Sequence, residues 1–400
     1  MRRKKALVYF TTFDASLGGS EYLPLECVAA LQRTCDVTLA LQWPSDVRRA
    51  AALYEIPVDF ARLRIVALKP KSRLLRRLDA VLPFCTVRAL KRLARSHDLC
   101  VSCANMIDFG RPAFHFIFFM RHFGDDAFIG KVLGRPPLRG WARVRKAVRK
   151  AVGERVLRPL LGVRSPRALL KDRREWFFPN SQYVLSEMRA FYGPFNARVL
   201  YPPTAFACGR AAPRRDPLKV VYVGRIKAEK RVEEIVGIVA AARARSGLDF
   251  RLEIAGALAE DAYAARIRAR ARENPWIALV GEVYGERKSL FLTSGTYAVH
   301  ARRDEEFGIA VAEYLKAGVL PVVPDAGGAP EVVAQKALVY RDDAEAAAIL
   351  VRLARDAAWR EEVARACRAR AAAFADAVWR RDFLSLVGWI EARAEAGHGR

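Results

Sequence analysis

The chain has 400 residues, of which 52% are hydrophobic and 28% charged, with 25 Gly and 20 Pro. This length exceeds what one ordinary core organises and the composition excludes a disordered chain, so we expect two globular domains. The formal net charge of +26 is unevenly spread, because residues 131–174 hold fifteen Lys and Arg against two acids, and residues 62–97 hold eleven against one.

Both basic segments carry Leu and Val at helical spacing, as at Leu74, Leu78 and Val81. Basic amphipathic segments suit an anionic membrane surface, and they would also suit nucleic acid. An arginine-favouring genome would give a milder version of this signal without the clustering. No apolar run is long enough to span a bilayer, and Met1–Lys5 leads into a short strand rather than a signal peptide. We therefore expect a cytoplasmic protein that is peripheral on the inner face of the cytoplasmic membrane.

The seven cysteines are odd in number and scattered. The one close pair, Cys100 and Cys103, falls in the apolar run at residues 98–106, which is typical of a strand. Positions i and i+3 of a strand face opposite sides, which is poor geometry for one metal ion. The pattern favours buried thiols in a reducing compartment.

The N-terminal part begins with a strand, a glycine loop and a helix. The strand is predicted at Ala6–Thr12, and the loop after it contains Gly18-Gly19-Ser20-Glu21. This order is typical of nucleotide-binding proteins, although the loop matches neither Gly-x-Gly-x-x-Gly nor Walker A and equally fits a tight turn with a helix cap. The run Phe114–Met120 is either a central buried strand or an exposed apolar lip. Other strands are predicted at Asp36–Leu41, Arg62–Leu68, Asp98–Met106 and Trp176–Ser181, with a helix at Gln182–Tyr192.

A Pro-rich segment at residues 201–217 predicts an interdomain linker. After it, strands and helices alternate regularly, which indicates a doubly wound parallel sheet. The apolar residues of the last helix, Val378–Ala394, fall largely on one face, so this helix should pack on another apolar surface. Strands are expected at Leu218–Val223, Phe250–Ala255, Ile277–Val280, Tyr297–Ala301, Val319–Val323 and Ala337–Tyr340, and the other helices of this end at Asp343–Arg355 and Ala358–Phe374.

Residues 296–331 form a strand–turn–helix–strand unit on which the functional prediction depends. Its helix starts near Gly308 and ends near Ala317, before a glycine suited to the left-handed cap. The helix N-terminus lies at the carboxyl end of a strand, where open α/β sheets bind ligands and free backbone N–H groups hold phosphate. Two carboxylates bracket this point, Glu305 before the helix and Glu313 inside it.

A second strand–turn–helix unit, residues 221–231, places Gly224 at the end of its strand and Arg225 and Lys230 at the start of its helix. Cations at a helix N-terminus oppose the helix dipole, so they are unfavourable for the helix alone. Their presence predicts an anionic ligand, phosphate above all, on the same sheet edge as Glu305. Surface charges in an arginine-rich chain are the alternative interpretation.

The sequence contains no Asp-x-Asp and no group of His, Cys and Asp with metal-ligand spacing. A diphosphate ligand would then be neutralised by positive side chains and a helix N-terminus rather than by Mg²⁺. We expect neither a metal nor another cofactor.

The sequence Glu305-Glu306-Phe307-Gly308-Ile309 with Glu313 resembles the Glu-x₇-Glu signature of the retaining family 4 glycosyltransferases. Gly224-Arg225 with Lys230 resembles that family's Gly-Arg…Glu-Lys element, and Gly18-Gly19-Ser20-Glu21 is similar to its N-terminal glycine loop. The resemblance is strongest over Leu218–Val333. Within the family, the motifs are most similar to GDP-mannose-dependent mannosyltransferases that use lipid-linked acceptors.

The resemblance implies an α/β GT-B fold with two Rossmann-like doubly wound domains and a deep cleft between them. The N-terminal, acceptor-side domain would span residues 1–200, the linker 201–217 and the nucleotide-sugar-binding domain 218–376, while residues 377–400 would form a helix packed on the N-terminal domain. The implied reaction is metal-independent, retaining transfer of a hexose from GDP-mannose or a UDP-sugar to a lipid-linked or cell-surface glycan, as in polysaccharide biosynthesis.

The resemblance also implies a role for each motif residue. Arg225 and Lys230 would hold the donor diphosphate and stabilise it as the leaving group. Glu305 would accept hydrogen bonds from sugar hydroxyls, and Glu313 would bind the ribose hydroxyls. Gly19 would let the N-terminal loop approach the diphosphate. The other donor-binding positions would be Gly224 and the backbone N–H groups of Phe307, Gly308 and Ile309.

Family members usually carry a histidine near the sugar in the N-terminal domain. Here His115 and His122 flank an apolar run, and neither falls cleanly on that position. His122, in a polar turn, is the better candidate for the acceptor or sugar side, and an ordinary loop histidine is the alternative. His300 is expected at a strand end near the donor, where a packed core histidine is the alternative.

Two other functions fit parts of the pattern. A nucleic-acid-binding α/β protein would use the basic segments, but it leaves Glu305 and Glu313 unexplained, since carboxylates repel phosphate. Nucleic acid is therefore not an expected partner. A GT-B protein that has lost catalysis and only binds is the second alternative, because the position of the histidine is open.

Overall fold

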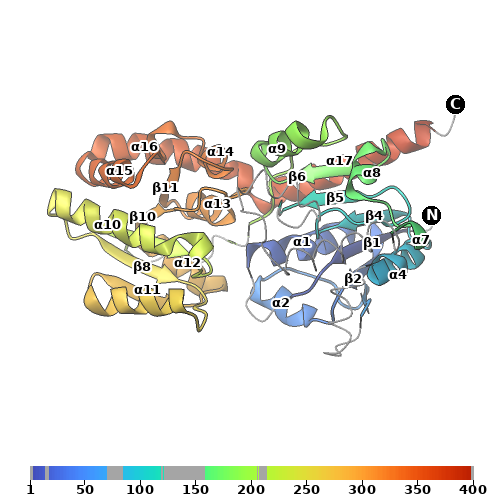
Figure 1. The fold of residues 1–400 in the computed structure, drawn as a ribbon, viewed down its shortest axis with the longest axis horizontal. Helices are drawn as coiled ribbons and strands as arrows, with labels where there is room; N and C mark the ends of the chain where they lie inside the picture. The colour runs from blue at the N-terminus through green and yellow to red at the C-terminus, as the bar shows by residue number, and fades with distance from the viewer. Residues whose placement is uncertain are drawn as a thin grey trace, which may run out of the picture.

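The computed structural model describes residues 3–13, 18–69, 84–118, 120, 158–204, 206 and 214–397. Two six-stranded parallel sheets stand side by side, each covered by helices (Figure 1). Counted along its own half of the chain, each sheet has the strand order 3-2-1-4-5-6 of doubly wound nucleotide-binding folds. The predicted α/β architecture with two Rossmann-like halves is confirmed.

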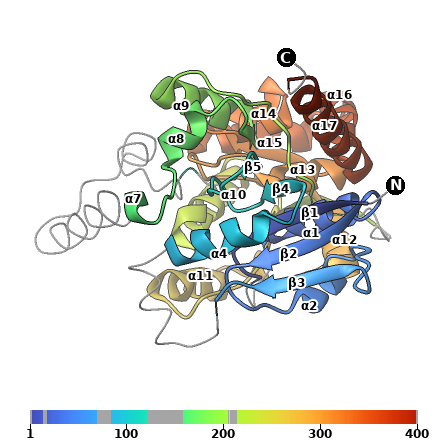
Figure 2. The ribbon, with the colours of Figure 1, turned by 90° about the vertical axis from the view of Figure 1, so that its right-hand side faces the viewer.

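The N-terminal sheet has the order β3-β2-β1-β4-β5-β6, and its edge strand β3 faces the viewer in Figure 2. The central strands are almost fully buried, as expected for parallel strands covered on both faces. The strands are β1 (Lys4–Phe10), β2 (Cys35–Leu41), β3 (Leu63–Ala67), β4 (Leu99–Ser102), β5 (Phe114–Ile117) and β6 (Trp176–Pro179). The helices are η1 (Gly19–Glu21), α1 (Tyr22–Leu31), α2 (Val47–Leu53), α4 (Phe84–Ala94), α7 (Arg158–Leu160), α8 (Pro166–Lys171) and α9 (Gln182–Tyr192).

The C-terminal sheet has the order β12-β11-β10-β7-β8-β9. Its strands are β7 (Asp216–Val223), β8 (Arg251–Ala255), β9 (Ile277–Gly281), β10 (Gly295–Val299), β11 (Leu320–Pro324) and β12 (Val339–Tyr340). Its helices are η4 (Ala228–Lys230), α10 (Val232–Ser246), α11 (Ala262–Glu273), α12 (Gly285–Ser294), α13 (Ile309–Lys316), α14 (Ala329–Val333), η5 (Lys336–Leu338), α15 (Asp343–Arg355), α16 (Ala357–Ala371) and η6 (Ala372–Phe374).

Every strand of the N-terminal half differs from its predicted bounds by at least one residue, and β4 and β5 are the informative cases. β4 ends at Ser102 rather than Met106, because the Ser102 hydroxyl donates to the carbonyl of Asn105, whose φ of 58° turns the chain. The apolar run at 114–120 contributes the buried strand β5 between β4 and β6, so its interpretation as an exposed lip is wrong. Cys27, Cys35, Cys100, Cys103 and Cys367 are buried free thiols, as predicted.

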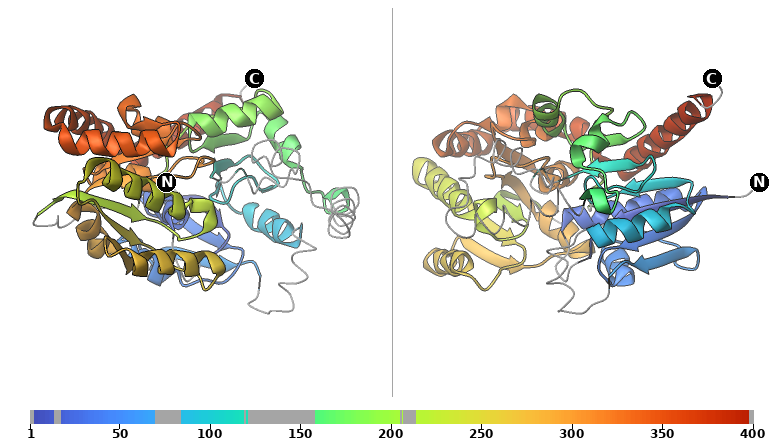
Figure 3. Two further views of the ribbon diagram at one scale, coloured as in Figure 1. Left: turned by 60° about the vertical axis from the view of Figure 1, so that its left-hand side comes forward. Right: turned by 45° about the vertical axis from the view of Figure 1, so that its right-hand side comes forward.

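The last helix, α17 (Asp376–Gly397), leaves the C-terminal half and runs along the N-terminal half (Figures 1 and 3). Trp379 and Phe383 stack on each other and pack beside Phe116 of β5. The Arg380 guanidinium donates to both carboxylate oxygens of the fully buried Glu26, at 2.6 and 2.7 Å. The predicted return of the C-terminal helix is confirmed, and the helix begins two residues earlier than expected.

We predict that Arg380→Met destabilises the protein by about 3–5 kcal/mol, because it leaves the Glu26 carboxylate buried without its ionic partner. Urea unfolding followed by circular dichroism measures the change. The neighbouring Arg381→Met is the matched control, since Arg381 is largely exposed, and it should change the free energy of unfolding by no more than about 0.5 kcal/mol. Equal losses in the two variants would contradict the anchoring role of Arg380.

Candidate active site

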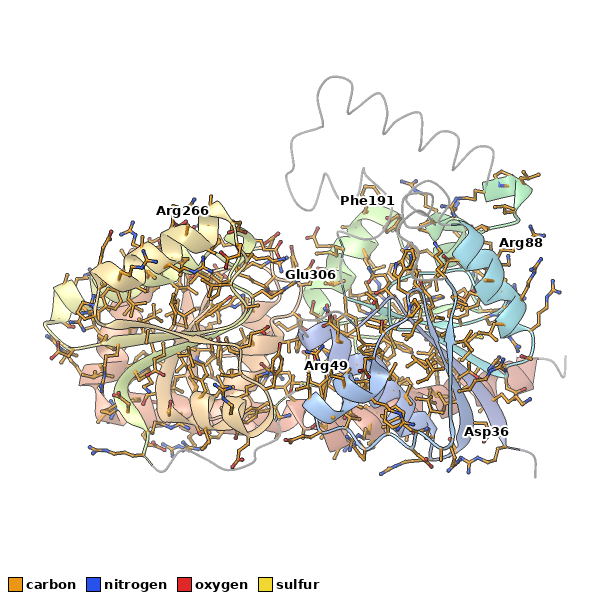
Figure 4. The ribbon with its side chains drawn as sticks, turned by 90° about the horizontal axis from the view of Figure 1, so that it is seen from below. Asp36, Arg49, Arg88, Phe191, Arg266 and Glu306 are labelled. Carbon is orange, nitrogen blue, oxygen red and sulfur yellow. The ribbon has the colours of Figure 1, made fainter. Side chains whose placement is uncertain are left out.

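A cavity of about 840 Å³ lies between the two halves of the protein, at the carboxyl ends of both sheets. Glu306, which is labelled in Figure 4, lines this cavity where the halves meet. The N-terminal wall includes Tyr54, Phe118 and Asn180. Every predicted site residue in the described part of the chain lines the cavity, namely Gly19, Gly224, Arg225, Lys230, Glu305, Phe307, Gly308, Ile309 and Glu313.

Glu305 lies in the loop between β10 and α13 and is 9% exposed. Its Oε2 accepts from the Lys230 ammonium at 2.7 Å, and its Oε1 accepts from the Arg302 guanidinium at 3.3 Å. Burial alone would raise the pKa of Glu305, but the charges of Lys230 and Arg302 outweigh it and hold the pKa at about 2. The carboxylate is therefore ionised at neutral pH, and Lys230 is already paired with it.

Arg302 fixes the shape of this loop and was not singled out by the sequence. Its guanidinium is buried and bonds to Asp304, Glu305 and Glu306. Burial alone would lower the pKa of Arg302, but its acidic partners raise it, so the charge is permanent. The cluster of acids directly after Arg302 was the available signal, because acids buried at the end of a strand need a cation.

The Gly327–Gly328 loop supports the same segment from behind. The Gly328 N–H donates to the carbonyl of Glu305 at 2.7 Å, and a Cβ at either glycine would lie within 2.6 Å of a backbone oxygen of residues 303–306. Gly327 also has a φ of +70°, which side-chain-bearing residues rarely adopt. Two glycines are thus required for this backbone to hold Glu305 in place.

The N-terminus of α13 opens into the cavity. Its N-cap, Gly308, has a φ of +95° and offers no side chain to cap the helix. Gly308, Ile309 and Ala310 line the cavity, so the first N–H groups of the helix are directed at a ligand site. The Phe307 side chain instead packs against Tyr201 and Phe374 in the core. Residue 307 can therefore contribute to the site mainly through its backbone.

Glu313 lies one turn further along α13 and is 3% exposed. Lys288 of α12 donates to its carboxylate at 2.5 Å. The sequence did not identify Lys288, because the pairing depends on how two separate helices pack against each other. Each of the two bracketing carboxylates thus has its own lysine.

Arg225 follows β7 and is the more exposed of the two predicted cations, with 49% of its side chain accessible. Its guanidinium is 3.9 Å from Glu229, which is a weak, solvent-exposed pairing. Arg225 and Lys230 both line the cavity, as expected from their place on the sheet edge. Lys230 is paired with the buried Glu305, whereas the pairing of Arg225 with Glu229 is long and exposed.

The N-terminal glycine loop closes the cavity opposite α13. A Cβ on Gly19 would lie 2.7 Å from Cδ1 and 2.8 Å from Cγ2 of Ile309. The Tyr54 hydroxyl donates to the Gly18 carbonyl at 2.5 Å, and Glu21 accepts from the Gly18 N–H. The loop is thus held against the α13 N-terminus, and a side chain at position 19 would require the Ile309 side chain to shift.

The two halves are also bonded to each other beside Glu306. The Ser181 hydroxyl, which caps α9, donates to the Glu306 carbonyl at 2.6 Å. The Glu331 carboxylate accepts from the backbone N–H groups of Gln182 and Tyr183, at 2.9 and 3.2 Å. The N-terminus of an N-terminal-half helix is therefore capped by a carboxylate of the C-terminal half.

The histidines differ in their surroundings. His115 is fully buried, and its Nε2 lies 3.0 Å from Glu175, so it is a core residue. His122 lies outside the described residues. His300 follows β10, is 5% exposed and lines the cavity, with its Nε2 3.5 Å from Glu305. Burial is the largest cause that lowers the pKa of His300 to about 4, so the ring is neutral at neutral pH.

We predict that Gly19→Ala lowers the free energy of unfolding by about 1–3 kcal/mol, the usual effect of overpacking. Adding Ile309→Ala should recover most of this loss, because it removes the atoms that the new methyl group meets. The matched control is Gly237→Ala inside α10, where a Cβ meets nothing within 4 Å and should stabilise the helix by up to about 1 kcal/mol. Thermal unfolding measures all three, and a neutral Gly19→Ala would argue against the contact.

Residues 210–371 match the family model described as Glycosyl transferases group 1. No protein of established annotation matches the chain as a sequence relative. Solved structures with the same fold share little sequence with it. HepE from Anabaena, solved with UDP and glucose, superposes with a TM-score of 0.66 at 14% identity, over 96% of this chain and 99% of that one.

Two further structures superpose similarly. Sucrose-phosphate synthase from Thermosynechococcus elongatus has a TM-score of 0.67 at 16% identity, covering 98% of this chain and 100% of its own. The pneumococcal O-GlcNAc transferase GtfA, solved with UDP and GlcNAc, has a TM-score of 0.65 at 10% identity, covering 98% and 99%. Residues 210–371 are therefore a glycosyl transferases group 1 domain in a chain with the GT-B fold, and the predicted enzyme class, a glycosyltransferase, is confirmed.

Proposed function

We propose that the protein is a retaining, metal-independent glycosyltransferase that moves a hexose from a nucleotide-diphosphate sugar to a lipid-linked or cell-surface glycan. The observation that carries this proposal is the meeting of Glu305, Glu313, Arg225 and the uncapped α13 N-terminus around one cavity. Such a site combines positive charge for a diphosphate with carboxylates for hydroxyl groups, which neither a phosphate site nor a sugar site alone requires.

The donor diphosphate would lie at the N-terminus of α13, with Arg225 and Lys230 beside it. In glycosyl transfer the glycosidic bond breaks early and the sugar becomes oxocarbenium-like, so stabilising the departing diphosphate is the main catalytic task. The helix N–H groups and two cations can supply this stabilisation. For the described residues, no group of three His, Cys, Asp or Glu side chains is placed as metal ligands, and the proposal of metal independence rests on the cations.

The two carboxylates would accept hydrogen bonds from hydroxyl groups of the donor. The ionised Glu305 has acceptor lone pairs for the sugar, and Glu313, deeper along α13, would bind the ribose. Each carboxylate is paired with a lysine, so binding of the nucleotide sugar would replace these ion pairs by contacts with the ligand. The neighbours solved with UDP, HepE and GtfA, support a nucleotide-sugar donor. The motif resemblance supports GDP-mannose, and a UDP-sugar is the other candidate.

The acceptor would bind to the N-terminal half, residues 1–200, at a membrane surface. Arg88 and Arg92 of helix α4 and Arg95 directly after it are exposed, and Leu160 of α7 is 76% exposed. None of the described helices is long and apolar enough to cross a membrane. The proposal is therefore a protein that lies peripherally on the inner face of the cytoplasmic membrane, where basic side chains attract anionic lipid.

We predict that Glu313→Ala abolishes the thermal stabilisation by the nucleotide sugar that raises the melting temperature most in a panel of UDP-, GDP- and ADP-sugars. Arg225→Ala should lower turnover by about 10²–10³-fold, the size of losing one donor to a developing oxyanion. Glu362→Ala and Arg266→Ala are matched controls on exposed helices outside the cavity. Wild-type turnover in both site variants would refute the site, and binding without any turnover would favour a GT-B protein that only binds.

We predict that the protein floats with vesicles that contain anionic lipid at low salt and not with neutral vesicles. Reversing Arg88, Arg92 and Arg95 to Glu should weaken this binding by roughly 3 kcal/mol or more, at about 1 kcal/mol for each basic residue. Reversing Arg266, Arg270 and Arg272 of α11 makes the same charge change elsewhere and should have little effect. Absence of binding at low salt would reject the membrane proposal, and steep salt-dependent binding to DNA or RNA instead would favour a nucleic-acid function.

A further inference from the structure

His300 is a buried polar residue of the cavity to which the proposed reaction gives no role. Its backbone is fixed on two sides by the sheet. The N–H donates to the Val322 carbonyl of β11 at 2.9 Å, and the carbonyl accepts from the Tyr340 hydroxyl at 3.0 Å. The position of the side chain is therefore set by the core of the C-terminal half rather than by the loop that follows.

The imidazole Nε2 of His300 is buried and has no hydrogen-bond partner. It lies 3.5 Å from Oε2 of Glu305, which is about 0.5 Å longer than an ordinary N–H···O hydrogen bond. A buried donor without an acceptor is unfavourable. A small movement of the Glu305 carboxylate toward the ring would remove this penalty.

The same carboxylate oxygen is held by Lys230. The ammonium Nζ lies 2.7 Å from Oε2, while Arg302 bonds to the other oxygen, Oε1, at 3.3 Å. In the proposed reaction Lys230 turns to the donor diphosphate. Glu305 then loses the partner of Oε2 while the carboxylate stays buried, which is costly unless another donor replaces it. The His300 Nε2 is the buried nitrogen that already faces this oxygen, and it is a donor in the tautomer that carries the ring proton there.

We infer that His300 is a positioning residue for Glu305, donating its Nε2–H to Oε2 when a nucleoside diphosphate takes Lys230. The inference rests on the proposed function and adds an exchange of hydrogen-bond partners at one oxygen. Oε2 of Glu305 accepts from Lys230 before the nucleotide sugar binds and from His300 afterwards. Glu305 thereby keeps its position and its charge, while its remaining lone pairs accept hydrogen bonds from sugar hydroxyls.

The protonation state of His300 agrees with this role. Burial, with a contribution from Lys230 and Arg302, lowers the pKa of the ring to about 4 against the opposing charge of Glu305. Among the described residues, these three are the ones whose charges act on the ring. A neutral donor holds the carboxylate without forming a second strong ion pair, which the sugar hydroxyls would have to compete with.

Nuclear magnetic resonance of the ring tests the exchange directly. The protein has five histidines, and comparison with His300→Gln assigns the signals of one of them in long-range ¹H–¹⁵N spectra. We expect a neutral Nε2–H tautomer whose Nε2 signals shift when UDP or GDP binds, and a Lys230→Met protein in which that shift is present without nucleotide. An Nδ1–H tautomer, or no shift with a nucleotide that binds, would overturn the inference.

Donor turnover provides the second test, with UDP-glucose and GDP-mannose as probes and release of free sugar as the signal. His300→Phe removes the donor atom, and it should raise the Kd for UDP or GDP and lower kcat/KM about ten- to hundredfold, as expected for one hydrogen bond to a charged group that forms only in the complex. His300→Gln places an amide N–H near the position of Nε2 and should recover most of this loss.

The outcomes separate the inference from the proposed function. Equal losses in His300→Phe and His300→Gln, or no loss in either while the wild type turns over, would overturn the role of His300 alone. If the wild-type protein neither binds nor turns over either probe, and Glu313→Ala changes nothing, then the proposed function fails and the inference fails with it.

Discussion

Keeping the Glu305 carboxylate ionised inside the cleft is the constraint on which the surrounding structure depends. A carboxylate removed from water is destabilised by several kcal/mol unless cations and hydrogen bonds replace the solvent. Lys230 comes from η4, Arg302 from the loop of Glu305 itself, and the Gly327–Gly328 backbone supports that loop from behind. Three segments of the C-terminal half therefore meet at Glu305, and the open end of α13 lies beside it.

The charges that line the site are balanced by one another. Lys230 neutralises Glu305 and Lys288 neutralises Glu313, while Arg225 remains half exposed at 3.9 Å from Glu229. A nucleotide-diphosphate sugar would therefore replace existing ion pairs rather than bind to unpaired charges. Arg225 can meet the diphosphate without first breaking a buried ion pair. Lys230 can leave Glu305 for the diphosphate only when another hydrogen-bond donor replaces it at Oε2. The residues around Glu305 would therefore take part in binding the nucleotide sugar.

The sequence predicted what is encoded locally. The alternation of strands and helices determines a doubly wound sheet, and the spacing of Glu305, Gly308 and Glu313 places them on one helix end. Contacts between distant segments could not be predicted in this way. Glu331 caps α9 from 149 positions further along the chain. The role of His300 likewise depends on Lys230 arriving from another strand–helix unit, and a single strand-end histidine gives no sign of it.

The backbone at residues 306–309 is contacted by the N-terminal half from two sides. Ser181 donates to the Glu306 carbonyl, and the glycine loop at Gly19 lies against Ile309. Both contacts involve the segment that begins α13, whose N–H groups face the cavity. Any rotation of one half against the other must therefore alter the α13 N-terminus itself. A donor that binds these N–H groups would therefore contact a segment that the N-terminal half, from which the proposed acceptor would approach, also touches.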